Sequence, residues 1–487
     1  SSVWPPRTTA YDTEAIYTGS AVVVDGAGPG GVGPGIIQIY PGLCDNASWT
    51  GCDTGTLLAQ AVPADYAGDP LLTNWTKPDY NPIVENTQRD PSTPWKTPSG
   101  EWRLRTFDSM VYGSASDADL VAGKWYTIGK SSSLRTCECP SLYPLPGPTP
   151  GTEEAYTAAA ATLPTSVHKT SCTGDWWQAG TYRAGPPRVL GNFTPTAGWE
   201  DLFEQRQIDV GFRQFIGNPF YASKDNEYPT LSGGRRRINW GWSNVPPGST
   251  QSLPREITFN AVTRTLEQAP IEELKALRQP AALSKSRLTL RNGTTHLPLK
   301  PGVGRHSELV ATFRAPGAHS EATGFEFGVG LGGSSARDPG ALFCMVEWSP
   351  RHNTSFYEVP VRCGGDRDTL RLGYDEETVD IRAFVDATFA EVFFQKGRVA
   401  ITKTLTTSNA SGVALAVNVT DVAASWRAAA RSPQGRTDID AVESATAAAH
   451  ERTPPAVSVS LLEATVYPME SIWVDAEQVR GGPRIYH

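Results

Sequence analysis

Short apolar segments separated by turn-forming residues run through the first 260 residues of the chain. Each segment is bounded by Gly, Pro, Asn or Asp, which favour turns. Many short strands with turns between them are typical of an all-β barrel, sandwich or propeller. The clearest segments are residues 21–24, 35–40, 102–107, 125–128 and 236–240.

The period of the pattern changes after residue 268. Ile271, Leu274 and Leu277 recur at a spacing of three, with acidic residues early in the stretch and basic residues late. This spacing predicts a short amphipathic helix over 271–278. We expect the helix to lie within a linker over residues 269–289.

Strand-like segments return beyond the linker, and residues 290–487 are numerous enough for a complete β-sandwich. One stretch, residues 423–452, departs from this pattern because it is rich in Ala and mixed in charge. It predicts either a helix–loop–helix or a disordered insertion between two strands. The expected strands lie at 309–313, 325–329, 379–385, 390–394 and 457–461.

Composition narrows the class of protein. The 487 residues include 46 Gly and 39 Pro, which fits a turn-rich β protein, and the length suggests two domains or more. The net charge of −8 argues against a nucleic-acid partner, which needs a basic surface. No apolar run approaches the ~20 residues of a membrane span. The chain starts at Ser1 without a signal peptide, which suggests a processed or truncated N-terminus.

The seven cysteines indicate disulfides rather than a metal site. None of them forms a CxxC pair, so we expect no metal and no cofactor. Cys44 and Cys52 could close a small loop, and we predict a disulfide between Cys344 and Cys363 in the sandwich. The odd number leaves at least one thiol free.

N-glycosylation sequons support a secretory route. Seven occur, and together with possible disulfides they favour a secreted, cell-wall or vacuolar (lumenal) protein. Their asparagines are Asn46, Asn74, Asn192, Asn292, Asn353, Asn409 and Asn418.

Two carboxylates, Asp90 and Glu138, are candidates for catalysis because they belong to an ordered set of short segments. Alone, either one would more often be a solvated surface group. The set is Tyr11-Asp12, YTGSA (17–21), NWTK (74–77), NPI (81–83), RDP (89–91), ECP (138–140), DWW (175–177), GTY (180–182), FYAS (220–223), RRINWGW (236–242), QSLPRE (251–256), FVD (384–386), EVF (391–393) and GR (397–398).

In kind and order these segments resemble those of glycoside hydrolase family 32, which contains invertases, fructan exohydrolases, inulinases and fructosyltransferases. The resemblance extends over nearly the whole chain. It implies a five-bladed β-propeller over residues 1–268, with the first blade largely missing, followed by a β-sandwich. It also implies retaining hydrolysis of terminal β-D-fructofuranosyl bonds in sucrose or a fructan.

The resemblance assigns roles to individual residues. Glu138 would be the general acid/base, and Asp90, helped by Arg89, would bind fructose hydroxyls and stabilise the oxocarbenium-like transition state. We expect both carboxylates to face one funnel, within about 10 Å of each other. Cys139 lies beside the acid, and we expect it to remain a thiol. Candidate walls of the sugar pocket are Ser20, Trp49, Trp75, Tyr182 and Trp242.

The nucleophile is absent from these 487 residues. Family members carry it as the Asp of an N-D-P-N-G-type motif that precedes the (S/T)GSA segment by tens of residues, and N-D-P occurs nowhere here. A propeller without its first blade would expose strand edges. We therefore expect a separate N-terminal fragment of the same protein to pack against residues 1–60 and to supply the nucleophile.

Two further departures from the family pattern widen the range of functions. Gln88 stands where an aromatic residue usually precedes R-D-P. Residues 243–247 (SNVPP) lack the acidic residues that plant-type invertases usually carry, which weakens a sucrose-specific assignment and leaves a fructan exohydrolase open. The alternatives are a non-catalytic sugar-binding or structural relative on the same scaffold, and a fructosyltransferase.

Overall fold

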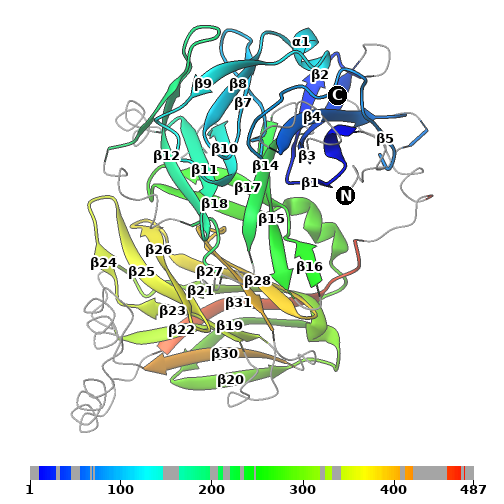
Figure 1. Cartoon of the computed structure of the whole chain (residues 1–487). Coiled ribbons are helices and arrows are strands. Elements are labelled where there is room, and N and C mark those ends of the chain that lie inside the picture. The colour runs from blue at the N-terminus through cyan, green and yellow to red at the C-terminus, as the bar shows by residue number, and fades with distance from the viewer. Residues whose placement is uncertain are drawn as a thin grey trace, which may run out of the picture.

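A computed structural model describes residues 10–28, 33–44, 55–65, 68–69, 72–145, 164–197, 207–211, 220–230, 235–245, 248–318, 324–331, 342–405, 412–419, 458–472 and 477. These residues form two β units, one above the other in Figure 1. Among them, no helix is long and apolar enough to cross a membrane. The described helices are short: η1 (Ala10–Asp12), α1 (Asp117–Val121), η4 (Glu272–Leu277) and η5 (Val303–Arg305).

Four antiparallel sheets of consecutive strands make the N-terminal unit (Figure 1). Their strands are β1 (Ala15–Ile16), β2 (Ser20–Asp25), β3 (Pro34–Leu43), β4 (Thr56–Pro63) and β5 (Trp75–Thr76); β6 (Trp95–Lys96), β7 (Trp102–Arg105), β8 (Met110–Ser114) and β9 (Tyr126–Lys130); β10 (Glu138–Pro144), β11 (Ser166–Ser171), β12 (Asp175–Arg183) and β13 (Asn192–Pro195); and β14 (Tyr221–Pro229), β15 (Arg235–Val245), β16 (Gly248–Gln251), β17 (Arg255–Asn260) and β18 (Thr265–Pro270).

Each of these sheets packs its apolar face against the next one. Alternate residues of each strand point to the same side, which gives each sheet an apolar face. On these faces, Ile39 of β3 lies in one apolar cluster with Leu104 of β7. The second sheet meets the third in the same way, through Trp95 and Leu142. The third meets the fourth through a cluster that includes Val167. This succession is that of propeller blades.

Two antiparallel sheets make the C-terminal unit, and their inner faces form one apolar core that includes Phe313, Phe327 and Trp348. One sheet contains β19 (Leu283–Arg291), β21 (His306–Arg314), β27 (Thr378–Asp386), β28 (Phe389–Phe394), β29 (Val399–Thr404) and β31 (Ser458–Pro468). The other contains β20 (Gly293–Pro298), β22 (Phe325–Leu331), β23 (Leu342–Trp348), β24 (Arg351–His352), β25 (Phe356–Cys363), β26 (Asp366–Gly373) and β30 (Gly412–Val419). The predicted propeller followed by a β-sandwich is confirmed.

The connection between the units differs from the prediction in two respects. The expected amphipathic helix is a 3-10 helix, η4, in which Leu274 is buried. A 3-10 helix has three residues per turn, which explains the spacing of three in the sequence. The linker is also shorter than the predicted 269–289, because β19 begins at Leu283.

Some predicted features lie outside the described residues. They are the stretch at 423–452, Trp49, Cys52, and the sequons at Asn46 and Asn409.

A buried histidine in β11 should make stability depend on pH. His168 is 1% exposed, and its Nε2 lies 2.7 Å from Arg105 Nη1. Burial, assisted by the charges of Arg105 and Arg135, lowers the pKa of His168 well below 6.5. The folded protein therefore keeps His168 neutral, whereas the unfolded chain takes up a proton below about pH 6.5.

We expect this site to cost about 1.4 kcal/mol of stability for each pH unit below 6.5, until the folded protein also protonates. Urea unfolding at pH 7.5 and pH 5 should show a smaller loss in His168→Gln, because Gln accepts a hydrogen bond without titrating. The exposed His296 supplies the control, His296→Gln. Equal losses in the two variants would contradict the prediction.

Candidate active site

Two irregular strand positions shape the candidate site. The ladder between β10 and β11 is interrupted between Glu138 and Ser141, and the ladder between β14 and β15 is interrupted between Tyr221 and Lys224. Such bulges re-aim side chains and occur often beside active sites.

The backbone around these bulges is strained as well. Cys139 and Ala222, inside the two interruptions, have φ of 43° and 52°, and Asp90 has φ of 61°. Non-glycine residues rarely adopt positive φ, and such residues cluster at functional sites. The three strained residues come from separate segments, and Cys139 and Asp90 are in direct contact.

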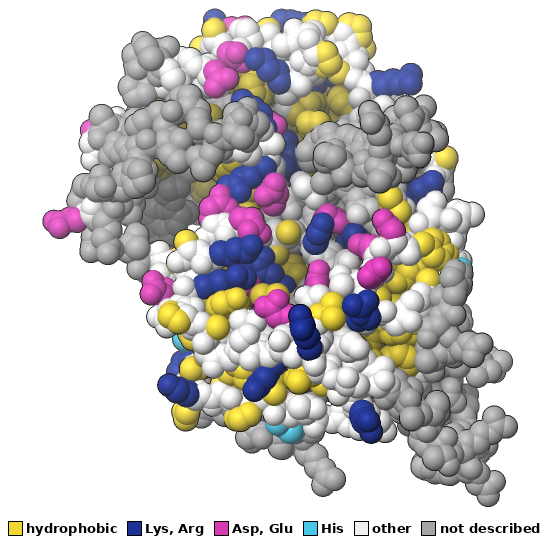
Figure 2. All heavy atoms as spheres, turned by 180° about the vertical axis from the view of Figure 1, so that it is seen from behind, with side chains coloured by type: hydrophobic (Ala, Val, Ile, Leu, Met, Phe, Trp, Pro, Cys, Tyr) yellow, Lys and Arg dark blue, Asp and Glu magenta, His cyan; other side chains and the backbone are white. Residues whose placement is uncertain are grey.

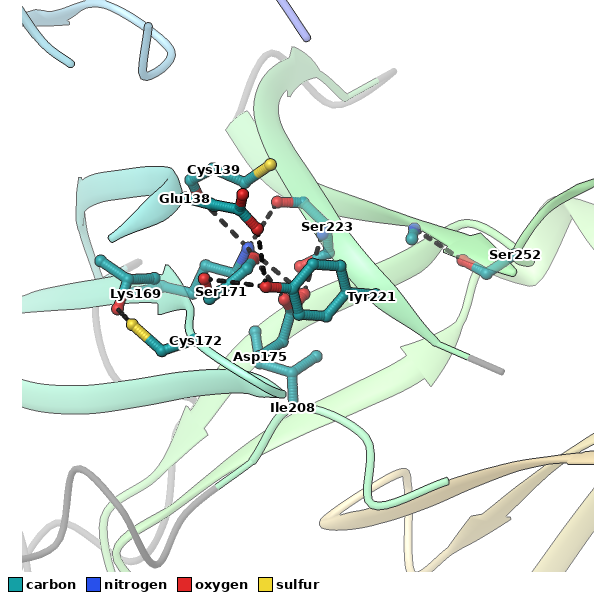
Figure 3. Close-up of polar contacts among 12 residues, drawn as sticks. Glu138, Cys139, Lys169, Ser171, Cys172, Asp175, Ile208, Tyr221, Ser223 and Ser252 are labelled. Atoms are coloured by element: carbon teal, nitrogen blue, oxygen red, sulfur yellow. Dashed lines mark hydrogen bonds and ion pairs between the residues drawn. The ribbon is translucent and has the colours of Figure 1, made fainter. Parts of the chain in front are cut away.

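Glu138 lies at the start of β10, with its side chain 36% exposed. Arg89 Nη2 donates to its Oε1 at 2.8 Å, and the Tyr221 hydroxyl donates to its Oε2 at 2.9 Å. Figure 3 shows Tyr221 and Glu138 pointing toward one another from β14 and β10. Burial, and then the hydrogen bond to Glu138, raise the pKa of Tyr221, so Tyr221 keeps its proton. The carboxylate is thus held on two sides and remains open to solvent.

Asp90 is buried behind Glu138, at 4% exposure. Its Oδ2 accepts the Cys139 backbone N–H at 3.0 Å and lies 3.9 Å from Arg89 Nε. The Arg89 guanidinium, which also lies over the Phe107 ring, therefore contacts both carboxylates. The structure brings Asp90, Arg89 and Glu138 together.

A buried ion pair supports the site from below. Lys169 Nζ lies 3.2 Å from Asp175 Oδ2 and donates to the Ser223 carbonyl at 2.6 Å and the Cys139 carbonyl at 3.3 Å. Asp175 also accepts the Ser223 N–H and the Ser171 hydroxyl (Figure 3). These bonds fix β10, β11, β12 and β14 relative to one another beneath Glu138.

Of the predicted residues of the pocket wall that the structure describes, some lie beside the site and others make their contacts elsewhere in the N-terminal unit. Ser20 donates to the Pro91 carbonyl at 2.6 Å, one residue beyond Asp90. Trp242 is 45% exposed and pairs in register with Tyr221. Tyr182 packs edge-on against Trp95, and the Trp75 indole donates to Leu72. Ser20 and Trp242 therefore adjoin the site, whereas the described contacts of Tyr182 and Trp75 are with other parts of the unit.

Three groups near the site had no role assigned from the sequence. Tyr221 lies in the segment FYAS (220–223), so the sequence offered a signal for it as a site residue. Lys169 carries a weaker signal, a lone cation within a strand that is buried throughout. Lys224 is partly buried and donates to the Pro91 carbonyl at 2.9 Å, and desolvation lowers its pKa.

A cleft of about 310 Å³ adjoins the site between the first and fourth sheets. Tyr17 and Ser20 line one side, and Lys224 and Trp240 line the other. The two sheets also meet directly, because Asn226 Nδ2 donates to the Ala21 carbonyl at 3.1 Å.

The cysteines are placed largely as predicted. Cys344 and Cys363 form a disulfide, and Cys139 is a buried free thiol, which confirms both predictions. Burial raises the pKa of Cys139 to about 11. Cys44 is also disulfide-bonded. A further disulfide joins Cys137 to Cys172 and was not foreseen from the sequence.

Family models match most of the chain. Residues 5–270 match the N-terminal domain of glycosyl hydrolases family 32, and residues 273–428 match the C-terminal domain of that family. The chain belongs to glycoside hydrolase family 32. The resemblance found in the short segments is confirmed.

Individual relatives within family 32 are similar over different lengths. A rice protein (Oryza sativa subsp. indica), beta-fructofuranosidase insoluble isoenzyme 3, is 31% identical over 57% of this chain and 47% of its own. A rose protein (Rosa hybrid cultivar), acid beta-fructofuranosidase 2, vacuolar, is 24% identical over 80% of this chain and 65% of its own. The chain thus spans about half to two thirds of these relatives.

A solved structure matches the fold over nearly the full length of the chain. Fructan 1-exohydrolase IIa from Cichorium intybus superposes with a TM-score of 0.65, covering 96% of this chain and 86% of its own, at 19% identity. At that identity, the likeness shows the shared propeller-and-sandwich fold.

Proposed function

We propose that this protein is a retaining glycosidase that releases terminal β-D-fructofuranosyl units from sucrose or a fructan. The observation that carries the proposal is the cluster at the two bulges, where one arginine contacts a buried aspartate and a partly exposed glutamate. Membership in family 32 supports the substrate class. The names of the relatives, fructofuranosidases and a fructan exohydrolase, agree with it.

In the first step, a nucleophilic carboxylate attacks C2 of the fructosyl unit while Glu138 donates a proton to the glycosidic oxygen. The bond between C2 and that oxygen breaks, and the remaining sugar leaves as an alcohol. In the second step, Glu138 takes a proton from water, whose oxygen attacks C2 and releases the carboxylate. Asp90 and Arg89 would bind fructose hydroxyls during both steps.

We place the nucleophile on a segment outside these 487 residues, either a separate N-terminal fragment or an adjoining stretch of the same protein. Of the described carboxylates near Glu138, Asp90 is assigned to binding fructose hydroxyls, and Asp175 is paired with Lys169. The cleft between the first and fourth sheets lies beside Ser20 and is a candidate surface for that segment.

A second candidate, a non-catalytic sugar-binding relative, is favoured by one observation. The first and fourth sheets contact each other through Asn226 and Ala21, which a ring of four sheets would require.

On the face shown in Figure 2, basic and acidic side chains are interspersed, so a polyanion would find no uniformly basic surface on that face. A neutral sugar is therefore the ligand that we propose for either function.

The test is an assay of the protein with every chain that co-purifies, using sucrose and 1-kestose as substrates. We expect free fructose to be released, and a fructosyl ester to be trapped on an Asp outside residues 1–487 and located by peptide mass. Transfer of fructose to a second sugar instead of water would indicate a transferase. Sugar binding without turnover or ester would reject the enzyme and support the binding protein.

A further inference from the structure

We propose that the disulfide between Cys137 and Cys172 positions Glu138 for proton transfer, so that reducing this bond suppresses turnover without unfolding the protein. The proposal rests on the role of Glu138 in the proposed function.

The disulfide closes the end of a strand pair that hydrogen bonding alone holds weakly. Cys137 immediately precedes Glu138, and Cys172 immediately follows Ser171, the register partner of Glu138. Regular pairing of β10 with β11 resumes only at Ser141, beyond the bulge. Glu138 therefore lies on a short end between the bulge and the crosslink, which would fray without the crosslink.

The crosslinked end contains the groups that orient the carboxylate. The Tyr221 hydroxyl lies 2.9 Å from Glu138 Oε2 and 3.1 Å from the Ser171 carbonyl oxygen, so both strands meet at this tyrosine. On the other side of Glu138, the Cys139 N–H donates to Asp90. A shift of Cys137 would move Glu138 relative to Tyr221, Arg89 and Asp90 together. Misplacing a reacting group by about 1 Å can cost on the order of 100-fold in rate.

The second described disulfide differs in both position and exposure. Cys344 and Cys363 are direct register partners inside the sandwich, and both are fully buried. Cys137 and Cys172 are partly exposed. A dithiol reductant should therefore reach the Cys137–Cys172 bond first. Each reduction converts one disulfide into two thiols and oxidises one dithiol to its own disulfide.

The experiment compares Cys137→Ser/Cys172→Ser with Cys344→Ser/Cys363→Ser in the complete preparation. The first variant should lose kcat by about tenfold or more, with a smaller change in KM and an altered pH profile of kcat. The second should keep kcat and the pH profile and lose only thermal stability. An unchanged kcat and pH profile in the first variant would overturn the proposal.

Two further arms cover failure to fold and failure of the proposed function. If the first variant does not fold, the folded wild type is reduced with dithiothreitol, the thiols are mapped by mass, and activity should return on reoxidation. If the wild type has no fructosidase activity, the proposed function fails, and hydrogen exchange decides the positioning role separately. Reduction should speed exchange around Glu138 and Cys139 while the sandwich stays unchanged, and unchanged exchange there would reject it.

Discussion

Glu138→Gln is expected to remove most turnover while leaving sugar binding nearly intact. The amide keeps the shape of the side chain and can still accept a hydrogen bond from Arg89. It cannot deliver a proton to the glycosidic oxygen, nor take one from water. General acid–base catalysis contributes about 10²- to 10⁴-fold, so kcat should fall by that factor in an assay of fructose release. Binding of fructose, measured by calorimetry, should weaken only slightly.

Glu256→Gln is the matched control for this experiment. Glu256 lies on β17 of the same unit, its side chain is 33% exposed, and it forms a long ion pair of 3.7 Å with Arg236. Its exposure therefore resembles that of Glu138, but it belongs to no part of the site. A loss of kcat shared equally by the two variants would indicate a general effect of removing a charge. Full activity in Glu138→Gln would reject Glu138 as the acid.

Prediction of the fold succeeded where apolar residues alternate along a strand. Residues 379–385 became part of β27, because Val379, Ile381 and Ala383 all face the sandwich core. It failed at β19, which among the described strands pairs only with β31 and has most of its residues exposed. An edge strand with little buried surface has few apolar residues, so its polar sequence resembles that of a linker.

The sequence predicted the site residues that lie within recognisable segments. It did not predict the residues that join the site only through the fold. Asp90 and Glu138 belong to R-D-P and E-C-P, and they do meet at Arg89. Lys169 lies in no such segment, and it reaches the site because β11 passes beneath β10 and β14. The Cys137–Cys172 pair is 35 residues apart, and no spacing rule connects two such cysteines before the strand pairing is known.

Two other segments noted in the sequence, QSLPRE (251–256) and EVF (391–393), meet between the two units. Arg255 of β17 is fully buried and lies 2.9 Å from Asp209 Oδ2 and 2.6 Å from Glu391 Oε2. Glu391 belongs to β28 of the sandwich, and its Oε1 accepts the Leu253 N–H at 2.7 Å. The guanidinium also lies against the rings of Phe220 and Phe393. One cation thus neutralises carboxylates from both units. Burial raises the pKa of Glu391, and the positive charge of Arg255 opposes this rise.

Arg255→Met is therefore expected to lower the free energy of unfolding by about 3–5 kcal/mol, because it keeps the volume and leaves two buried carboxylates without their cation. Denaturant unfolding, followed by the fluorescence of the 14 tryptophans, measures this loss. Arg235→Met is the control: Arg235 lies on β15, its side chain is 55% exposed, and its ion pairs with Glu227 and Asp25 are long, at 3.5 Å and 3.9 Å. Such a surface pair contributes about 0–1 kcal/mol. Equal losses in the two variants would show that the buried cluster does not hold the propeller to the sandwich.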